Sequence, residues 1–348
     1  MRALKSDKGA TQVRAMNVRD VARRAGVSPS TISRALNAPE LLSDQTRRRV
    51  LGIIEKAGYY PNANARALFA ATNRTLGVIV SNIANPYFLD IFRGIESRAH
   101  QRGYELLLAN TDYRPDRLSA AVRMMLERRV AGLAVVVSEI DEALIAELAR
   151  SEIRVAFSGV DTPGANFTNV KVNCRKGMKK VLTYLASLGH RRMVFVAHHA
   201  SLESITERSA AFLEGARQFE SGAGSLIYAD ADSIAGGRQA ARDILASGFR
   251  PTAIVCVNDV IALGVLKELR ERDVQVPAEM SVTGFDDIEF AEAFSPALTT
   301  VNISRERIAE NLFQSLCGAS STIRREIAID PQLVLRESTG PAQMHRTA

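Results

Sequence analysis

The sequence contains no tryptophan and only three cysteines in 348 residues. Cys174, Cys256 and Cys317 are widely separated, so they predict neither a disulfide framework nor a metal knuckle, and this usage is typical of a reducing cytoplasm. No apolar run approaches the roughly 20 residues that a membrane helix needs. Residues 1–8 lack the apolar stretch of a secretion signal. We therefore expect a cytoplasmic protein with no membrane partner.

The sequence also lacks the short motifs of common enzyme chemistry. It has no G-x-G-x-x-G fingerprint, no Walker motif, no G-x-S-x-G elbow and no H-E-x-x-H zinc motif. His198 and His199 are adjacent, and neighbouring residues on a strand point to opposite faces, so they are not expected to share a metal. We expect no catalytic residue, no metal site and no cofactor.

Positive charge is concentrated at one end of the chain. The whole sequence has 45 Lys and Arg against 38 Asp and Glu, a net charge of +7. Residues 1–75 contain 14 basic and 5 acidic residues, whereas the remainder contains 31 and 33. A basic module joined to a nearly neutral body is typical of a phosphate-binding headpiece. The alternative is a solvated basic tail or a targeting arm.

Two short helices are predicted in the basic segment. Asn17 caps the first, and Gly26 ends it where a left-handed residue is needed. Ser28 caps the second, and Pro29 stands at its first position, where the missing N–H costs nothing. Two helices joined by so short a turn form a helix-turn-helix. The second helix is expected to present its polar side chains to a DNA groove: Ser30, Thr31, Ser33 and Arg34.

A third helix is expected from the cap Ser43 to Ala57, followed by a short Ala-rich helix over residues 62–70. A helix as short as the last one is marginal alone and should form only against a partner. The matching motifs run from Asn17 through Ser28-Pro29-Ser30-Thr31-Ile32-Ser33-Arg34-Ala35-Leu36-Asn37 to Tyr60-Pro61-Asn62 and Ala65-Arg66-Ala67-Leu68. This pattern strongly resembles the DNA-binding head and hinge of the lactose-repressor (LacI/GalR) family of bacterial transcriptional regulators.

The resemblance implies how the segment would bind DNA. In that family the hinge helices of two subunits pair on operator DNA, and a hinge leucine enters the minor groove between base pairs. Leu68 matches that leucine; the alternative is an ordinary core leucine. The DNA-contacting residues implied by the family are Val18, Ser28, Pro29, Ser30, Thr31, Ser33, Arg34, Asn37, Asn62, Ala65 and Leu68.

Small residues occupy the positions of the second helix that read bases in this family. Pro29 and Ser30 stand there, and neither is suited to bidentate base pairing. Thr31 and Ser33 are expected to hold phosphates, and Arg34 is the candidate for a guanine or phosphate contact. The operator sequence therefore stays open.

From Leu76 onward, short apolar runs alternate with amphipathic stretches of helix length. The runs begin at Leu76–Ser81 and continue to Ser281–Phe285, with helical stretches such as Phe88–Arg102 and Val260–Arg272 between them. Strands separated by helices predict parallel, doubly wound sheets. The expected fold class is α/β: a helix-turn-helix headpiece with a hinge helix, then two doubly wound parallel-sheet subdomains of periplasmic-binding-protein type.

Polar and aromatic residues follow the predicted strands, at the ends where ligands of such folds bind. They are Asn85-Pro86-Tyr87-Phe88, Asn110-Thr111-Asp112, Ser138, Ser158, Asn258-Asp259 and Phe285-Asp286-Asp287. Amides and carboxylates bind hydroxyl groups in pairs, and aromatic faces cover C–H patches. This combination predicts a polyhydroxylated ligand.

The same stretches resemble the effector-binding core of the LacI/GalR family, which is itself similar to periplasmic sugar-binding proteins. The resemblance covers roughly residues 17–341 and implies the effector residues Tyr87, Phe88, Arg208, Asn258 and Asp286. The positions at strand ends add Asp112 and Ser138 to the expected effector site. Purine-binding members carry an extra arginine six residues before the Arg208 position, where this chain has Leu202. That difference favours a neutral sugar or a sugar acid.

Each effector residue also has a purely structural interpretation. Asp286 and Asp112 could cap helices, Arg208 could form a surface ion pair, Asn258 could belong to a turn, and Phe88 could fill the core. A sugar-binding transport protein is a rival for the body, but it would need a secretion signal and would not carry a helix-turn-helix.

The resemblance implies a division of the chain and a function. We expect a disordered basic leader (1–16), the helix-turn-helix domain (17–61), a hinge helix and linker (62–75), the effector-binding and dimerisation core (76–341) and a tail (342–348). Within the core, the expected subdomains are about 76–172 plus 303–329 and about 173–302 plus 330–341. The tail has no leucine heptad, which favours a homodimer over a tetramer.

The implied function is a non-enzymatic, sequence-specific DNA-binding regulator. It would repress a carbohydrate-utilisation operon by binding a near-palindromic operator, and would then lie on the nucleoid. A small-molecule effector would control its operator affinity allosterically.

Overall fold

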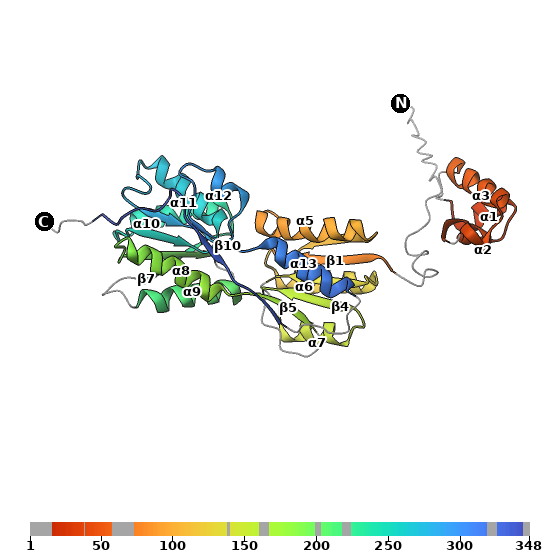
Figure 1. Cartoon of the computed structure of the whole chain (residues 1–348), viewed down its shortest axis with the longest axis horizontal. Coiled ribbons are helices and arrows are strands. Elements are labelled where there is room, and N and C mark those ends of the chain that lie inside the picture. Colours follow the sequence, from red (N-terminus) through yellow and green to blue (C-terminus); the bar gives the residue numbers. More distant parts are fainter. Residues whose placement is uncertain are drawn as a thin grey trace, which may run out of the picture. The chain divides into compact units, whose positions relative to one another are not determined.

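The computed structural model describes residues 16–37, 39–57, 73–137, 140–159, 167–198, 203–217, 224–318 and 326–343. The chain divides into two compact units, Met1–Asn73 and Arg74–Ala348, here called the headpiece and the body (Figure 1). The expected leader, the hinge helix with Asn62, Ala65 and Leu68, Ser138, and most of the tail lie outside the described residues. Within the described part, no helix is long and apolar enough to cross a membrane.

The headpiece forms helices around a small apolar cluster. They are α1 (Val18–Ala25), α2 (Pro29–Asn37), the 3-10 helix η1 (Pro39–Leu41) and α3 (Asp44–Lys56). The Asn17 side chain accepts hydrogen bonds from the backbone N–H groups of Arg19 (2.9 Å) and Asp20 (3.1 Å), and so caps α1. Gly26 ends α1 with a φ of 58°, a left-handed conformation that favours glycine. The predicted helix-turn-helix is confirmed.

The cluster consists of one face from each helix. Its buried members are Val21, Ala22, Ala25, Ile32, Ala35, Val50 and Ile54. These residues recur at three- and four-residue spacing, so burying them leaves the opposite faces of the helices to solvent. Arg34 on α2 and Arg47–Arg49 on α3 are among the exposed charged residues of these helices.

The first lobe of the body is built on a six-stranded parallel sheet. Its strand order is β11-β5-β4-β3-β1-β2, with β1 (Thr75–Val80), β2 (Glu105–Asn110), β3 (Gly132–Val136), β4 (Arg154–Ser158), β5 (Thr168–Val172) and β11 (Glu326–Ile329). Its helices are α5 (Pro86–Gln101), α6 (Pro115–Glu127), α7 (Glu142–Arg150) and α13 (Arg305–Cys317). Val78 and Val80 face the cluster of α5 and α13, whereas Ile79 faces α6 and α7. Both faces of the sheet are therefore covered (Figure 1).

The second lobe is built on a four-stranded parallel sheet. Its strand order is β7-β6-β8-β9, with β6 (Met193–His198), β7 (Gly224–Ala229), β8 (Ala253–Cys256) and β9 (Ser281–Thr283). Its helices are α8 (Cys174–Ser187), α9 (Glu203–Ala216), α10 (Ile234–Ala246), α11 (Asp259–Glu271) and α12 (Glu289–Ala293). An antiparallel pair, β10 (Thr300–Asn302) with β12 (Gln332–Val334), lies beside the crossings between lobes. The predicted two parallel-sheet subdomains are confirmed.

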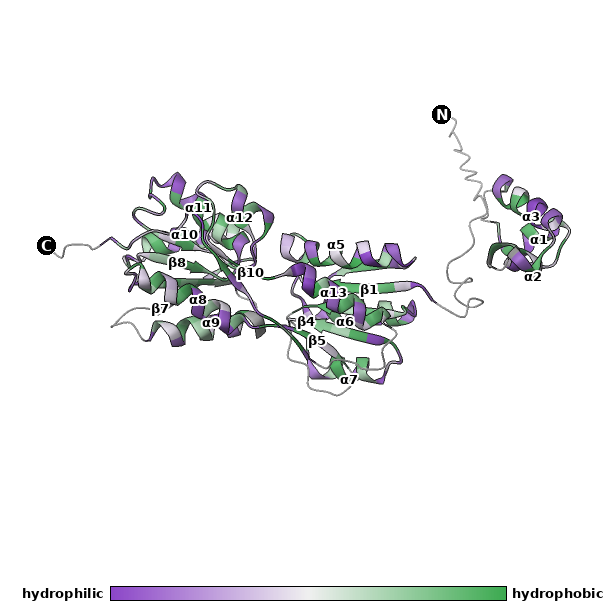
Figure 2. Ribbon diagram, in the orientation of Figure 1, coloured by the Kyte–Doolittle hydropathy of each residue, from purple (hydrophilic) through white to green (hydrophobic). Residues whose placement is uncertain are grey.

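The chain passes between the two lobes near residues 173, 303–304 and 330–331, since β5, α13 and β11 belong to the first lobe and α8, β10 and β12 to the second. Strands are hydrophobic along most of their length, and the helices alternate between hydrophobic and hydrophilic residues (Figure 2). The carboxyl ends of β1, β2 and β7 lead into loops that make contacts between lobes described below.

Candidate nucleic-acid interface and lobe junction

The polar face of α2 begins with a small network of hydroxyl groups. The Ser28 hydroxyl lies 2.7 Å from the Ser30 hydroxyl and 2.9 Å from the Thr31 hydroxyl, and it accepts from the Thr31 backbone N–H at 3.2 Å. Pro29, Ser30 and Arg34 are exposed, whereas Thr31 is half-buried. The helix therefore presents a short, rigid polar start and one arginine, a surface that can approach phosphates and base edges closely.

The other predicted DNA-binding residues of the headpiece are placed differently. Val18 is half-buried and packs against the apolar cluster of the headpiece. Ser33 is half-buried on α2, and Asn37 ends α2, but its side chain lies outside the described residues. The other two helices of the headpiece, α1 and α3, carry exposed arginines: Arg19, Arg23, Arg24, Arg47, Arg48 and Arg49. They provide the positive charge that phosphate binding needs.

In the body, the carboxylate of Asp232 is the meeting point of the two lobes. From the first lobe, its Oδ2 accepts hydrogen bonds from Asn82 Nδ2 (3.1 Å), Asn85 Nδ2 (3.2 Å) and the Tyr113 hydroxyl (2.7 Å). From the second lobe, Asn258 Nδ2 donates to Oδ1 at 2.6 Å. We call these five residues the lobe junction. A single carboxylate thus receives donors from both lobes.

The three asparagines are held in this orientation by their backbone roles. Asn85 Oδ1 accepts from the Tyr87 N–H at 3.1 Å and caps α5, and Asn258 Oδ1 accepts from the Ile261 N–H at 3.0 Å and caps α11. Asn82 Oδ1 accepts from the Ala84 N–H at 3.0 Å. Because each carbonyl oxygen is used in this way, each NH₂ group must point toward Asp232 as a donor.

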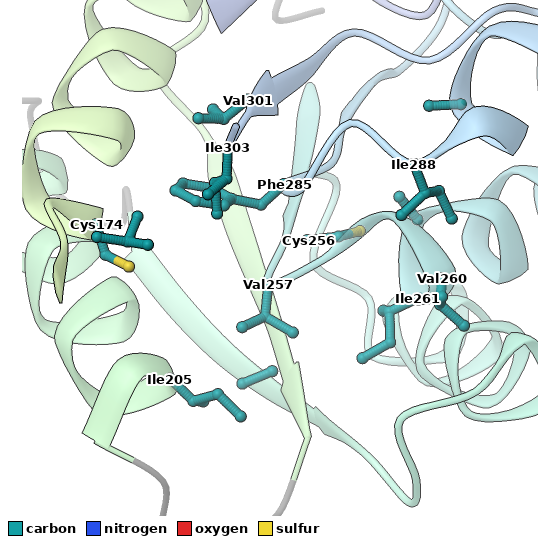
Figure 3. Close-up of a cluster of buried hydrophobic side chains, with 14 of the residues drawn as sticks. Cys174, Ile205, Cys256, Val257, Val260, Ile261, Phe285, Ile288, Val301 and Ile303 are labelled. Atoms are coloured by element: carbon teal, nitrogen blue, oxygen red, sulfur yellow. The ribbon is translucent and has the colours of Figure 1, made fainter. Parts of the chain in front are cut away.

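A buried ion pair lies beside the junction in the second lobe. Arg208 Nη2 is 3.4 Å from Asp286 Oδ1, and the two side chains are only 9% and 5% exposed. Arg208 Nη1 donates to the Val257 carbonyl at 2.6 Å, and its guanidinium lies over the Phe285 ring, 4.1 Å from the centroid. Phe285 is itself part of the buried cluster that includes Cys174 (Figure 3). The arginine is therefore fixed by apolar packing as well as by charge.

Burial acts in opposite directions on the pKa values of the two members of the pair. Burial raises the pKa of Asp286 to about 7, with Asp232 adding to the rise and Arg208 opposing it. The pKa of Arg208 is also raised: burial opposes the rise, but Cys174 and Asp286 outweigh it. Both groups therefore bind their protons more tightly than in water. Of the two, Asp286 is the one whose charge changes near neutral pH: its carboxylate takes up a proton as the pH falls through about 7.

The loop that carries Asp286 has an unusual backbone. Asp286 and Asp287 have φ values of 115° and 56°, a region that non-glycine residues rarely adopt. The buried Asp259 carboxylate holds the loop by accepting from the Ile288 N–H at 2.8 Å. A Cβ at Gly284 would lie 2.1 Å from Asp259 Oδ1, so only glycine fits there. Strain of this kind gathers at functional sites.

Aromatic rings line the first-lobe side of the same region. Phe88 stacks edge-on with Tyr87 (centroids 5.2 Å apart) and with Tyr113 (6.3 Å), and Tyr113 lies 5.1 Å from the ring of His198 in the second lobe. Burial raises the pKa of the Tyr87 phenol, and the Asp286 carboxylate raises it further. Tyr87 is thus close to the ion pair of the other lobe.

The structure brings most of the predicted effector residues together. Tyr87, Phe88, Arg208, Asn258 and Asp286 lie at or beside the lobe junction, as the preceding contacts show. Asp112 is the exception among the described ones, because its side chain is 58% exposed and pairs with Arg117 at 3.2 Å. Ser138 lies outside the described residues.

Sequence reasoning missed three residues of the junction: Asn82, Tyr113 and Asp232. Each lies within three residues of a strand end, after β1, β2 and β7 respectively. The rule that ligand sites follow strand ends would have found Asp232, had it been applied to the strand that ends at Ala229. Among the described residues, no group of three or more His, Cys, Asp and Glu side chains could hold a metal ion.

Two family models match the chain. Residues 17–62 match the model described as bacterial regulatory proteins, lacI family, and residues 182–339 match the periplasmic binding protein-like domain. The first covers the helix-turn-helix, and the second covers much of the second lobe with Arg208, Asp232, Asn258 and Asp286.

Relatives and solved structures cover nearly the whole chain. The HTH-type transcriptional repressor PurR of Erwinia tasmaniensis is 33% identical over 94% of this chain and 99% of its own length, and that of Photobacterium profundum is 30% identical over 92% and 98%. The Lac repressor dimer bound to operator and the anti-inducer ONPF is 27% identical, with a TM-score of 0.76 over 94% of this chain and 100% of its own. A LacI family regulator from Silicibacter pomeroyi is 26% identical, with a TM-score of 0.81 over 93% and 99%.

These relatives are repressors, which confirms the expectation that the chain is not an enzyme. A helix-turn-helix with a basic surface and a two-lobed body with a polar junction are the two parts that such a regulator needs. The chain therefore belongs to the LacI family of bacterial regulatory proteins and is a DNA-binding transcriptional repressor with an effector-binding domain.

Proposed function

We propose that this repressor controls a carbohydrate-utilisation operon and that its effector is a neutral sugar or a sugar acid bound at the lobe junction. The observation that carries the proposal is the set of amides and carboxylates around Asp232 and Asp286, next to Tyr87 and Phe88. A ligand there would touch both lobes, so its binding energy would depend on how the lobes are arranged.

The chemistry of these groups suits a polyhydroxylated ligand. A ligand at the junction would contact the amide N–H donors of Asn82, Asn85 and Asn258, which bind Asp232 in this structure, and the carboxylates of Asp232 and Asp286. A sugar hydroxyl both donates and accepts, so it can use both kinds of group at once. Aromatic rings beside them can cover the C–H faces of a sugar.

The named relatives are PurR repressors, so the effector class has to be tested directly. Leu202 stands where purine-binding members carry an arginine, which supports the sugar alternative. Calorimetric titration of the full chain should show saturable binding of one sugar or sugar acid from a panel of pentoses, hexoses and uronic acids. Saturable binding of a purine base, with no sugar bound, would contradict the proposal.

Two variants would locate the binding in the junction. Arg208→Met should abolish effector binding, because it removes the buried cation beside Asp286 while keeping an apolar side chain of similar length. Asp116→Asn is the matched control, since Asp116 is 65% exposed on α6 and pairs with Arg114. Equal affinity of the two variants for the effector would place the site elsewhere.

On the DNA side, we propose that a homodimer places α2 of each subunit in the major groove of a near-palindromic operator. Pro29 and Ser30 would face the bases, Ser28, Thr31, Ser33 and Asn37 the phosphates, and Arg34 a guanine or a phosphate. Val18 would contribute through the start of α1. In the hinge, Asn62 and Ala65 would follow the minor groove, and Leu68 would open a base step.

Genomic footprinting with the purified protein would identify the operator and the regulated genes. Leu68→Ala should then weaken operator binding by about 2 kcal/mol or more. The leucine side chain would act as a wedge between base pairs of the bent operator, and it would have no such role on straight DNA. Affinity for unrelated DNA should hardly change. An equal loss on both DNAs would refute the wedge, and footprints confined to purine-biosynthesis genes would refute the carbohydrate operon.

A further inference from the structure

We propose that Asp232 is a tethered ligand: its carboxylate fills a carboxylate-binding position at the lobe junction and clamps the two lobes together. This clamp would act in the protein by itself, whatever the effector is. Four donors converge on one position between the lobes, and a side chain of the protein occupies it.

The donor set explains why a carboxylate is the matching group. The asparagine carbonyl oxygens are used by backbone N–H groups, so Asn82, Asn85 and Asn258 direct their NH₂ groups toward Asp232, and Tyr113 adds a hydroxyl. A carboxylate has two oxygens that only accept, and it can take all four bonds. An amide in place of the carboxylate would have only one accepting oxygen. Its NH₂ group would face the NH₂ and hydroxyl groups that donate to Asp232, and two donors cannot form a hydrogen bond.

The backbone around Asp232 is held rigidly by the second lobe. Ser233 caps α10, with its hydroxyl accepting from the Gly236 N–H at 3.1 Å. A Cβ at Gly236 would lie 2.2 Å from the Ala231 carbonyl, and one at Gly237 would lie 2.1 Å from the Ile261 carbonyl of α11. The loop is thus pressed against α10, and α10 against α11. Asp232 is therefore presented by a fixed element, as a bound ligand would be.

The bonds to Asp232 connect the lobes at a point distant in sequence from the crossings. Asn82, Asn85 and Tyr113 are 119–150 residues from Asp232 in sequence. All three bond to Oδ2, whereas Asn258, of the same lobe as Asp232, bonds to Oδ1. Loss of the carboxylate would therefore release the first lobe from the second at this point and leave the chain crossings intact.

The test measures the separation of the lobes in the full chain. Spin labels at Ser97→Cys on α5 and Ala246→Cys on α10, both exposed positions, report one distance within a chain. Cys317→Ser removes the half-buried thiol, and Cys174 and Cys256 are buried. Labelled chains are diluted with unlabelled ones, so that pulsed electron–electron double resonance measures only the distance between the two labels of one chain.

Asp232→Ala should give a longer and broader distance distribution than the parent, and Asp232→Asn should give the same change. Asp230→Ala is the matched control, an exposed carboxylate two residues away in the same loop, and it should leave the distribution unchanged. Sodium acetate should restore the short distance in Asp232→Ala, because it returns a carboxylate to the four donors, whereas sodium chloride at equal ionic strength should not.

Two results would overturn the proposal. An unchanged distance in both Asp232 variants would show that the carboxylate does not clamp the lobes. A lengthened distance that acetate leaves as it is, in a variant with the parent's circular dichroism spectrum, would show that the donors do not form a carboxylate position.

Discussion

Asp286→Asn tests whether burial or the Arg208 partner controls the charge beside the junction. Burial favours the neutral acid, whereas the guanidinium favours the carboxylate. The distance from Arg208 Nη2 to Asp286 Oδ1 is 3.4 Å, longer than the roughly 2.7–2.9 Å of a charge-assisted bond. The guanidinium also binds the Val257 carbonyl and the face of Phe285. Burial therefore dominates, and it raises the pKa of Asp286 to about 7.

This pKa fixes the sign of a pH dependence. An aspartate in an unfolded chain has a pKa of about 4, so between about pH 4 and pH 7 the folded protein holds a proton that the unfolded chain has lost. The free energy of unfolding therefore falls as the pH rises through this window. The stabilisation from the neutral Asp286 is complete below about pH 4 and lost above pH 7. A rise in pKa from about 4 to about 7 corresponds to about 4 kcal/mol.

The measurement is the free energy of unfolding of the body in wild type and in Asp286→Asn, from urea titrations between pH 5 and pH 8. Asparagine has no proton to lose, so the wild-type value minus the variant value should fall by about 3 kcal/mol over this range. Calorimetry near pH 5.5 should also show that unfolding of the wild type releases about one more proton than unfolding of Asp286→Asn. A difference that is flat or rises with pH would refute the reasoning, since Arg208 would then hold Asp286 charged.

Three further predictions concern local packing and are checked by calorimetric melting of the full chain. Gly264→Ala should destabilise the body by about 1–3 kcal/mol, because its Cβ would lie 2.2 Å from the Ile234 carbonyl; an unchanged melting temperature would show that α10 and α11 can separate at no cost. Gly52→Ala should stabilise the headpiece by about 0.5–1 kcal/mol, because nothing lies within 4 Å of that Cβ in α3, and a loss of stability would contradict it. Asn17→Ala should cost the headpiece about 1 kcal/mol through loss of the α1 cap, whereas an unchanged melting temperature would mean that the cap contributes nothing.

Local signals were enough to predict α1, α2 and α3 of the headpiece. Asn17, Gly26 and Ser43 act as the caps that their residue types indicate. The alternation of apolar runs and helical stretches also predicted two parallel sheets. It did not single out β5, β11 or α13; β11 and α13 join the first lobe from far away in the sequence, and β5 pairs with β11 on one side and with the nearby β4 on the other. In β11, Glu326 is exposed at the sheet edge, so the strand lacks the continuous apolar run that marks a central parallel strand.

The grouping of the predicted effector residues could be anticipated only in part. Asn258 caps α11 and also donates to Asp232, so one residue serves both the helix and the lobe junction. Asp112, which also follows a strand, instead pairs with Arg117 of the helix that comes next in the chain. Asp232 follows a strand that ends at Ala229, and three of its four donors come from the first lobe, so they reach it only when the lobes meet. Such convergence is a property of the tertiary fold, which no local pattern contains.

Arg305 shows how the loop of Asp286 is tied to the first lobe. It stands at the start of α13, where Nε donates to Asp90 Oδ2 of α5 at 3.0 Å. Nη1 donates to the Asp286 carbonyl, and Nη2 donates to the Asp287 carbonyl at 2.8 Å. The side chain of Asp286 faces Arg208, while its peptide group binds a helix of the other lobe. Both residues have positive φ, and their carbonyls are thus held in this conformation by Arg305. A ligand that changed the contacts of Asp286 would therefore act on α5 and α13 through hydrogen bonds that are already in place.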